Sequence, residues 1–252
     1  MLKQIVLLTA QRGQQLAITQ LMQAHNPSLS FRYALTGDDL QAIDPAVLGD
    51  ARLIAFTSGT IVPRHTLNAL GHGAYNFHPG PPTYAGWAPA HFALYDGVEH
   101  FGATAHEMAA HVDAGPIVGV ESFSIQQNIG VRELEQVAFI RLAFLFWRMS
   151  KELATHEAPL PTLPIHWSGT KSTRQMYIDM CRLPDDISKE EMARRIRAFS
   201  DDFRGNYPTI TMHGFEFRCT QAATVERKPV AEADSHPHLK VIAEAPALAL
   251  SA

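Results

Sequence analysis

Residues 76–86, Asn-Phe-His-Pro-Gly-Pro-Pro-Thr-Tyr-Ala-Gly, are the stretch of this chain that decides its fold. Asn76 and His78 lie two positions apart, so their side chains share one face if the segment entering them is a β-strand. The run of proline and glycine that follows cannot continue a hydrogen-bonded ladder, so the chain must leave the sheet there. The sequence therefore predicts an amide and an imidazole side by side at the end of a strand.

A second stretch, Val-Asp-Ala-Gly-Pro-Ile at residues 112–117, offers a carboxylate from a later loop. An amide, an imidazole and an acid can together hold a developing oxyanion and move one proton. We therefore take Asn76, His78 and Asp113 as the candidate catalytic residues. The alternative is that Asp113 belongs to an ordinary turn and that Asn76 and His78 are structural.

Short apolar runs alternate with helical patterns on both sides of this stretch. Strands are expected at residues 4–9, 30–35, 51–57, 74–78, 101–107 and 119–125, and helices at 14–24, 39–48, 63–70, 87–95 and 132–154. Alternation of this kind is typical of an α/β protein with a doubly wound, mostly parallel sheet, which binds ligands at the carboxyl ends of its strands.

The composition changes near residue 156, and the nine residues 157–165 contain three prolines. We place a linker there, which divides the chain into a catalytic domain, residues 1–160, and a small C-terminal α+β module, residues 161–252. The module is expected to contain a helix at 188–199 and a β-hairpin at 207–219. The end of the chain is expected to be poorly ordered.

Composition and charge narrow the class of protein. The net charge of −4 gives no general attraction to nucleic acid or to anionic membranes. The two cysteines are too few for a disulfide framework or a zinc site, and none of the 13 histidines has metal-ligand spacing on one helix. Arg141 and Arg148 interrupt the longest apolar region, residues 137–149, which predicts a buried helix and not a membrane span. We therefore expect a cytoplasmic enzyme without a metal ion.

Four elements in order resemble one protein family. They are Asn76-x-His78-Pro79, Pro82-x-Tyr84-x-Gly86, Gly102-x-Thr104-x-His106 and Asp113-x-Gly115-x-Ile117. Their order and spacing resemble the 10-formyltetrahydrofolate-dependent formyltransferases, which include methionyl-tRNA, glycinamide ribonucleotide and sugar-nucleotide formyltransferases. The resemblance covers residues 50–125 closely, and it implies a Rossmann-like formyltransferase domain.

The resemblance also implies roles for particular residues. The co-substrate would be N10-formyltetrahydrofolate, with Asn76 and His78 holding the oxyanion and Asp113 keeping His78 charged or oriented. The folate pocket would use the loop after the preceding strand, with apolar walls that could equally be plain core. The residues expected at the folate are Ser58, Gly59, Thr60, Ile61, Ile54 and Met108. Those expected to support the site on the substrate side are Tyr84, Trp87 and His106.

The acceptor is left open by the sequence. Many relatives carry Ser-Leu-Leu-Pro after His-Pro, whereas this chain has the shorter run Gly80-Pro81-Pro82-Thr83, which is similar to members acting on small amines. An amino sugar linked to a nucleotide is the first expectation. The alternatives are another amine, such as a hydroxyornithine-like compound or methionyl-tRNA, hydrolysis of formyltetrahydrofolate, and a non-catalytic folate- or nucleotide-binding protein.

Partners follow from the same reasoning. We expect a small-molecule amine, no membrane and no nucleic acid, since the chain has no room for the larger tRNA-binding domain of the methionyl-tRNA enzymes. The apolar C-terminal hairpin favours a homodimer. The C-terminal module would either line the acceptor side of the site or form the dimer interface, through Trp167, Lys171, Arg174 and Tyr177.

Overall fold

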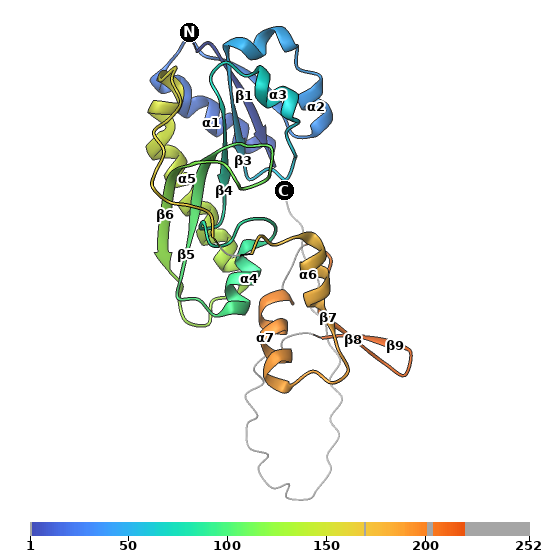
Figure 1. The fold of residues 1–252 in the computed structure, drawn as a ribbon. Coiled ribbons are helices and arrows are strands. Elements are labelled where there is room, and N and C mark those ends of the chain that lie inside the picture. Colours follow the sequence, from blue (N-terminus) through green and yellow to red (C-terminus); the bar gives the residue numbers. More distant parts are fainter. Residues whose placement is uncertain (1, 169, 201–203, 220–252) are drawn as a thin grey trace, which may run out of the picture. The chain divides into compact units, whose positions relative to one another are not determined.

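A six-stranded sheet forms the centre of the protein in the computed structural model, which describes residues 2–168, 170–200 and 204–219 (Figure 1). The strand order is β2–β1–β3–β4–β5–β6. Strands β1 to β4 run parallel, and β5 and β6 are antiparallel to their neighbours, which confirms the predicted mostly parallel sheet. The strands are β1 (Gln4–Thr9), β2 (Ser30–Ala34), β3 (Ala51–Phe56), β4 (Ala74–His78), β5 (His100–Glu107) and β6 (Ile117–Ser124).

Helices cover both faces of this sheet, as a doubly wound fold requires. They are α1 (Arg12–His25), α2 (Gly37–Gln41), the 3-10 helix η1 (Pro45–Asp50), α3 (Arg64–Ala69), α4 (Pro89–Asp96) and α5 (Val131–Thr155). Ile18 of α1 and Leu145 of α5 pack with Phe77 in one buried cluster, whereas Leu40 and Leu48 pack with Ala55 in another. The two clusters lie on opposite faces, since side chains alternate along each strand.

Two predicted helices differ from those observed. The helix expected at 39–48 is divided into α2 and η1, because Pro45 cannot continue a helix and Asp44 caps the new one by accepting a hydrogen bond from the Ala46 N–H. The helix expected from residue 87 begins at Pro89 instead. Ala88 has a left-handed φ of 53°, which no helix can include.

The C-terminal segment forms its own small sheet. It contains α6 (Arg174–Cys181), β7 (Arg182–Leu183), α7 (Lys189–Phe199), β8 (Thr209–Met212) and β9 (Phe215–Arg218), with the strands in the order β7–β8–β9. The predicted helix and hairpin are therefore confirmed. The domain boundary after residue 160 stays a prediction, and the tail expected to be poorly ordered lies outside the described residues.

The linker is bound to the sheet domain at several points. The Leu160 N–H donates to the Tyr75 hydroxyl, and the Leu163 N–H donates to the Ile117 carbonyl oxygen. Farther on, Ser172 forms a β-bridge with Gly86. The linker therefore carries Trp167, Lys171 and Ser172 to the loops that follow β4 and β5.

Helix α5 is only partly buried, in contrast to the sequence-based expectation. Its inner face, including Leu134, Ala138, Leu142 and Leu145, lies in the core. Its outer face exposes Phe139, Ile140, Phe144 and Trp147. No helix within the described part of the chain combines the length and hydropathy needed to cross a membrane.

Arg52 is a fully buried cation that joins β3 to the end of α5. Its Nε donates to the His72 carbonyl oxygen at 3.0 Å, and Nη1 donates to the Leu153 carbonyl oxygen at 2.7 Å. A further, longer bond reaches the Ala158 carbonyl oxygen at 3.3 Å. The guanidinium thus satisfies helix-terminal carbonyls and lies at the negative end of the helix dipole.

Replacing Arg52 by Met should destabilise the protein by about 2–4 kcal/mol, because several buried carbonyl oxygens lose a charged donor. Urea unfolding followed by circular dichroism measures the change. Arg32→Met, at an exposed position of β2, is the matched control and should change stability by less than about 0.5 kcal/mol. Equal stability of the two variants would contradict the structural role of Arg52.

Candidate active site

The candidate site lies on one face of β4, beside β5. Asn76 and His78 share this face, whereas Tyr75 and Phe77 point into the core on the other. The antiparallel register places Asn76 opposite His106 and His78 opposite Thr104. Because directly opposite residues in a sheet share a face, His106 lies beside Asn76, and its Nε2 is 3.0 Å from the Asn76 amide nitrogen.

The loop after β4 fixes the imidazole of His78. The Nε2 of His78 donates to the Tyr84 carbonyl oxygen at 2.9 Å, since a carbonyl can only accept. Gly80 leaves room for this ring, because a Cβ there would lie 2.6 Å from His78 Nε2. The Thr104 hydroxyl in turn donates to the Gly80 carbonyl oxygen at 2.7 Å. The Gly-Pro run is therefore required for the orientation of the ring.

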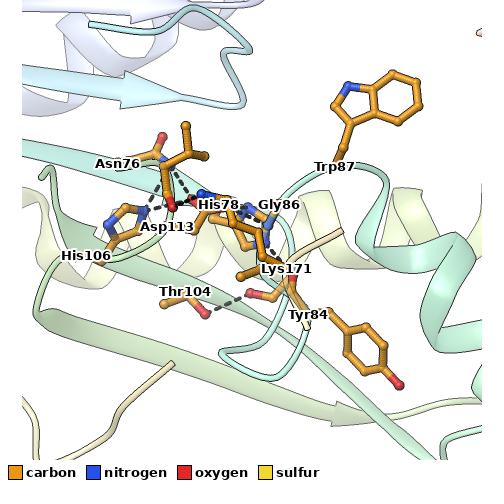
Figure 2. A network of polar contacts seen from close by, with 12 residues as sticks. Asn76, His78, Tyr84, Gly86, Trp87, Thr104, His106, Asp113 and Lys171 are labelled. Atoms are coloured by element: carbon orange, nitrogen blue, oxygen red, sulfur yellow. Dashed lines mark hydrogen bonds and ion pairs between the residues drawn. The ribbon is translucent and has the colours of Figure 1, made fainter. Parts of the chain in front are cut away.

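Asp113 comes from the loop after β5 and meets the first loop over the face of β4. Its side chain is buried, and one oxygen accepts the backbone N–H of Gly86 at 2.7 Å. The same oxygen is 3.5 Å from His78 Nδ1, and the other is 3.2 Å from His106 Nε2 and 3.5 Å from the Asn76 amide nitrogen (Figure 2). The structure therefore brings together the amide, the imidazole and the acid that the sequence singled out.

The environment keeps Asp113 ionised. Burial alone would raise its pKa, but the His106 hydrogen bond, the His78 charge and the Gly86 N–H outweigh burial and hold the pKa at about 2. At His78 burial is the largest effect and lowers the pKa. It outweighs the nearby Asp113 carboxylate and the Tyr84 carbonyl, which both act to raise the pKa. A carboxylate thus faces an imidazole that is neutral near pH 7.

The hydrogen-bond partners decide which atoms are available for chemistry. With its Nε2 hydrogen directed at Tyr84, neutral His78 presents a bare Nδ1 lone pair. His106 donates from Nδ1 to the Glu107 carbonyl oxygen at 2.8 Å, and its Nε2 lies 3.0 Å from the Asn76 amide nitrogen and 3.2 Å from the Asp113 carboxylate. One hydrogen of the Asn76 amide makes only the long contact to Asp113 and is therefore available to another acceptor.

A cavity of about 290 Å³ opens beside these groups. Asn76, His78, His106 and Asp113 line it on one side. Predicted pocket residues that line it are Ser58, Gly59, Thr60, Ile61, Trp87 and Met108. Others at its walls include Ala55, Gly86, His111, Val112, Lys171 and Ser172.

Comparison with known proteins agrees with the motif pattern and the fold. Residues 38–139 match the family model described as formyl transferase. A methionyl-tRNA formyltransferase of Streptococcus suis is 27% identical over 188 residues, 71% of this chain and 56% of the relative. Residues 38–139 therefore form a domain of the formyl transferase family, and the chain is similar to methionyl-tRNA formyltransferases. It spans little more than half the length of such curated relatives.

Solved formyltransferase structures share the fold. A sugar N-formyltransferase from a Shewanella species superimposes with a TM-score of 0.72 at 16% identity, over 87% of this chain and 97% of that one. An N-formyltransferase from Helicobacter canadensis, solved with folinic acid and dTDP-3-aminofucose, gives a TM-score of 0.60 at 14% identity, over 85% of each chain.

Two residues expected at the formyltransferase site lie elsewhere. Ile54 is in the core, paired in register with Tyr75, and the adjacent Ala55, paired with Asn76, lines the cavity instead. A shift of one residue along a strand moves a side chain to the opposite face. The Tyr84 side chain points away from the cavity, and its hydroxyl donates to Asp96 at 2.7 Å (Figure 2). Only its backbone carbonyl contacts the site.

Trp167 is a neighbour of the site that sequence reasoning left between two roles. Its indole N–H donates to the Gly115 carbonyl oxygen at 2.9 Å. Its ring meets His106 edge to face at a centroid distance of 5.0 Å and His78 at 5.9 Å. Trp167 thus packs against both imidazoles. No local sequence signal indicates this, because the linker has no regular periodicity.

Within residues 2–168, 170–200 and 204–219, no group of three or more His, Cys, Asp or Glu side chains is placed to hold a metal ion.

The depressed pKa of Asp113 makes stability depend on pH. A carboxylate whose pKa falls on folding stabilises the protein fully above its unfolded pKa of about 4, and this contribution is lost as pH falls toward about 2. The stability difference between the wild type and Asp113→Asn should therefore shrink over that interval, as measured by urea unfolding between about pH 5 and 2.5. Asp186→Asn, at an exposed position, is the control. A difference independent of pH would refute this prediction.

Proposed function

We propose that this protein transfers a formyl group from N10-formyltetrahydrofolate to the amino group of a small molecule. The observation that supports it most directly is the convergence of an amide, a neutral imidazole and an ionised carboxylate at one wall of a cavity. Formyl transfer needs a donor for the carbonyl oxygen as it gains charge and a base for the amine proton.

The cavity has features that suit the pterin end of a folate. Its volume of about 290 Å³ is near the lower end of the usual range for small-molecule sites. Ile61 presents an exposed apolar surface to it, and a Cβ at Gly59 would meet no atom within 4 Å. The backbone of the loop at Ser58–Ile61 can therefore approach the polar edge of a pterin. Met108 would supply an apolar wall, as the sequence led us to expect.

The bound folate supplies the formyl group, and the protein supplies the oxyanion donor and the base. The Asn76 hydrogen that makes only the 3.5 Å contact to Asp113 can donate to the formyl oxygen as that oxygen gains charge. His78 Nδ1 takes the proton that the acceptor amine loses as its nitrogen bonds to the formyl carbon, and returns it to the folate nitrogen N10 as the bond between N10 and the formyl carbon breaks. Asp113, ionised beside it, stabilises the resulting imidazolium. His106 holds the Asn76 amide in place.

This assignment changes one detail of the expectation from the sequence. From the sequence, His78 was expected to donate to the oxyanion, kept charged or oriented by Asp113. Its Nε2 hydrogen is directed at Tyr84 and its pKa is lowered, both of which favour a base over a donor. We therefore assign the oxyanion to Asn76 and the proton to His78.

An amino sugar linked to a nucleotide is the acceptor we propose to test first. The sugar N-formyltransferase structures share the fold of this chain over nearly their whole length. Trp87 and Lys171 also line the cavity, and they offer an aromatic surface and a cation. Methionyl-tRNA is the second candidate, because the sequence relatives carry that name.

One incubation separates the candidate functions. The purified protein is mixed with N10-formyltetrahydrofolate alone, with a dTDP-linked amino sugar, and with methionyl-tRNA, and tetrahydrofolate release is followed. Release only with an amine supports transfer and identifies its class. Release without an amine would indicate hydrolysis, and binding without turnover in any mixture would indicate a non-catalytic folate-binding protein; either result overturns the proposal.

His78→Ala and Asp113→Ala should each lower kcat by about 10²–10⁴, because they remove the base or the group that stabilises its charged form. Folate affinity should change by less than about threefold, since neither group is expected to carry most of the pocket contacts. His65→Ala, at an exposed position of α3, is the control. Unchanged turnover in either active-site variant would refute the assignment.

The pH dependence distinguishes a base from a cationic donor. Because burial lowers the pKa of His78, its neutral form persists to a pH below the ordinary value of about 6.5. The rate should therefore fall only on the acid side, with an inflection below about pH 6.5 in a plot of kcat against pH. A rate that instead falls as pH rises through this range would show that the imidazolium is the active form.

A further inference from the structure

The outer face of α5 carries a stripe of regularly spaced side chains, which we call the seam. Its positions are separated by four and three residues in alternation, and they are Glu133, Val137, Ile140, Phe144, Trp147 and Lys151. This is the spacing of coiled-coil contact positions. The seam runs over 19 residues, and its ends are about 27 Å apart along the helix. It is apolar in the middle and charged at its two ends.

The seam is open to solvent from Ile140 onward, whereas Val137 is half-buried against the core. Ile140 is 57% exposed, Phe144 44% and Trp147 57%. Phe144 and Trp147 stack on each other with ring centroids 5.6 Å apart, so they form one continuous apolar surface. Large exposed apolar patches of this kind mark interaction sites. The seam residues are not among those that line the cavity beside Asp113.

The two end charges indicate what covers the seam. Glu133 and Lys151 lie on the same stripe of the helix, at equal distances in sequence from its midpoint. If a second α5 packs against the first in the antiparallel direction, each Glu133 faces the Lys151 of the other copy, and Ile140 faces Phe144. A parallel pairing would instead place like charges together at both ends. Antiparallel pairing is also the arrangement that a two-fold axis across the helix generates.

From this complementarity we propose that α5 is the interface of a homodimer, in which two copies of the chain pair their seams antiparallel around a two-fold axis. The inference does not depend on the acceptor or on catalysis. It moves the expected dimer interface from the C-terminal hairpin to α5, although the hairpin also exposes Met212, Phe215 and Phe217. The hairpin is therefore the competing surface in the test.

Sedimentation equilibrium on the full chain, at concentrations from about 1 to 200 µM, measures the dimer dissociation constant. Ile140→Glu should abolish the dimer, because it buries a carboxylate among apolar side chains. Phe215→Glu, a matched exposed position on the hairpin, should leave the dissociation constant within about twofold. Circular dichroism verifies that both variants fold. A monomeric wild type, or a dimer lost only in the hairpin variant, overturns the proposal.

Charge reversal tests the direction of pairing. Glu133→Lys alone and Lys151→Glu alone each place like charges at both ends of the seam and should weaken the dimer at least about fivefold. An equimolar mixture of the two variants should form a heterodimer with nearly wild-type affinity, because each introduced charge then meets its opposite. A mixture no tighter than the single variants would contradict antiparallel pairing. Salt at about 0.5 M should reduce these differences.

Discussion

The carboxylate of Asp113 is the group on which the arrangement of the site depends. A buried carboxylate is costly unless donors and positive charge surround it. Here the backbone N–H of Gly86 donates to it, the ring of His106 lies 3.2 Å away, and the ring of His78, at 3.5 Å, adds positive charge when it is protonated. Each comes from a different segment, so one charge fixes the relative positions of the loop after β4, strand β5 and strand β4. The loop conformation follows from this requirement, including the left-handed φ of 45° at Asp113 itself.

Glycines make this arrangement sterically accessible. Gly86 has a φ of +93°, and a Cβ there would lie 2.2 Å from the Ser172 carbonyl oxygen. The linker can approach the loop and form its β-bridge only because position 86 has no side chain. Ser172 also donates from its hydroxyl to the Trp87 carbonyl oxygen at 2.6 Å. The linker is therefore part of the site's support, and changes in it should reach Asp113 through one backbone contact.

The sequence predicted the central elements of the site because the spacing of Asn76 and His78 and the proline run after them have local physical meaning. The strands were predicted correctly for a similar reason, since short apolar runs bounded by turn residues mostly form buried strands. Two site residues were predicted wrongly, one because alternate residues of a strand face opposite sides and one because a side chain is held elsewhere by a tertiary contact. Ile54 and Ala55 are both apolar, so composition cannot tell which of them faces the ligand side of β3. The Tyr84 side chain was placed at the substrate because motif position gives the location of the backbone and not the direction of a side chain.

The exposed face of α5 shows a further limit of sequence reasoning. A pattern with apolar residues on almost every side predicts a buried helix, and the inner stripe does pack into the core. The pattern cannot say whether the second stripe is covered by the same chain or by another, because both require the same side chains. The end charges make the distinction, since Glu133 and Lys151 have no ion-pair partner among the described residues and a reversed copy of the same helix offers each its opposite. An apolar stripe covered within the chain would have no need for such complementary ends.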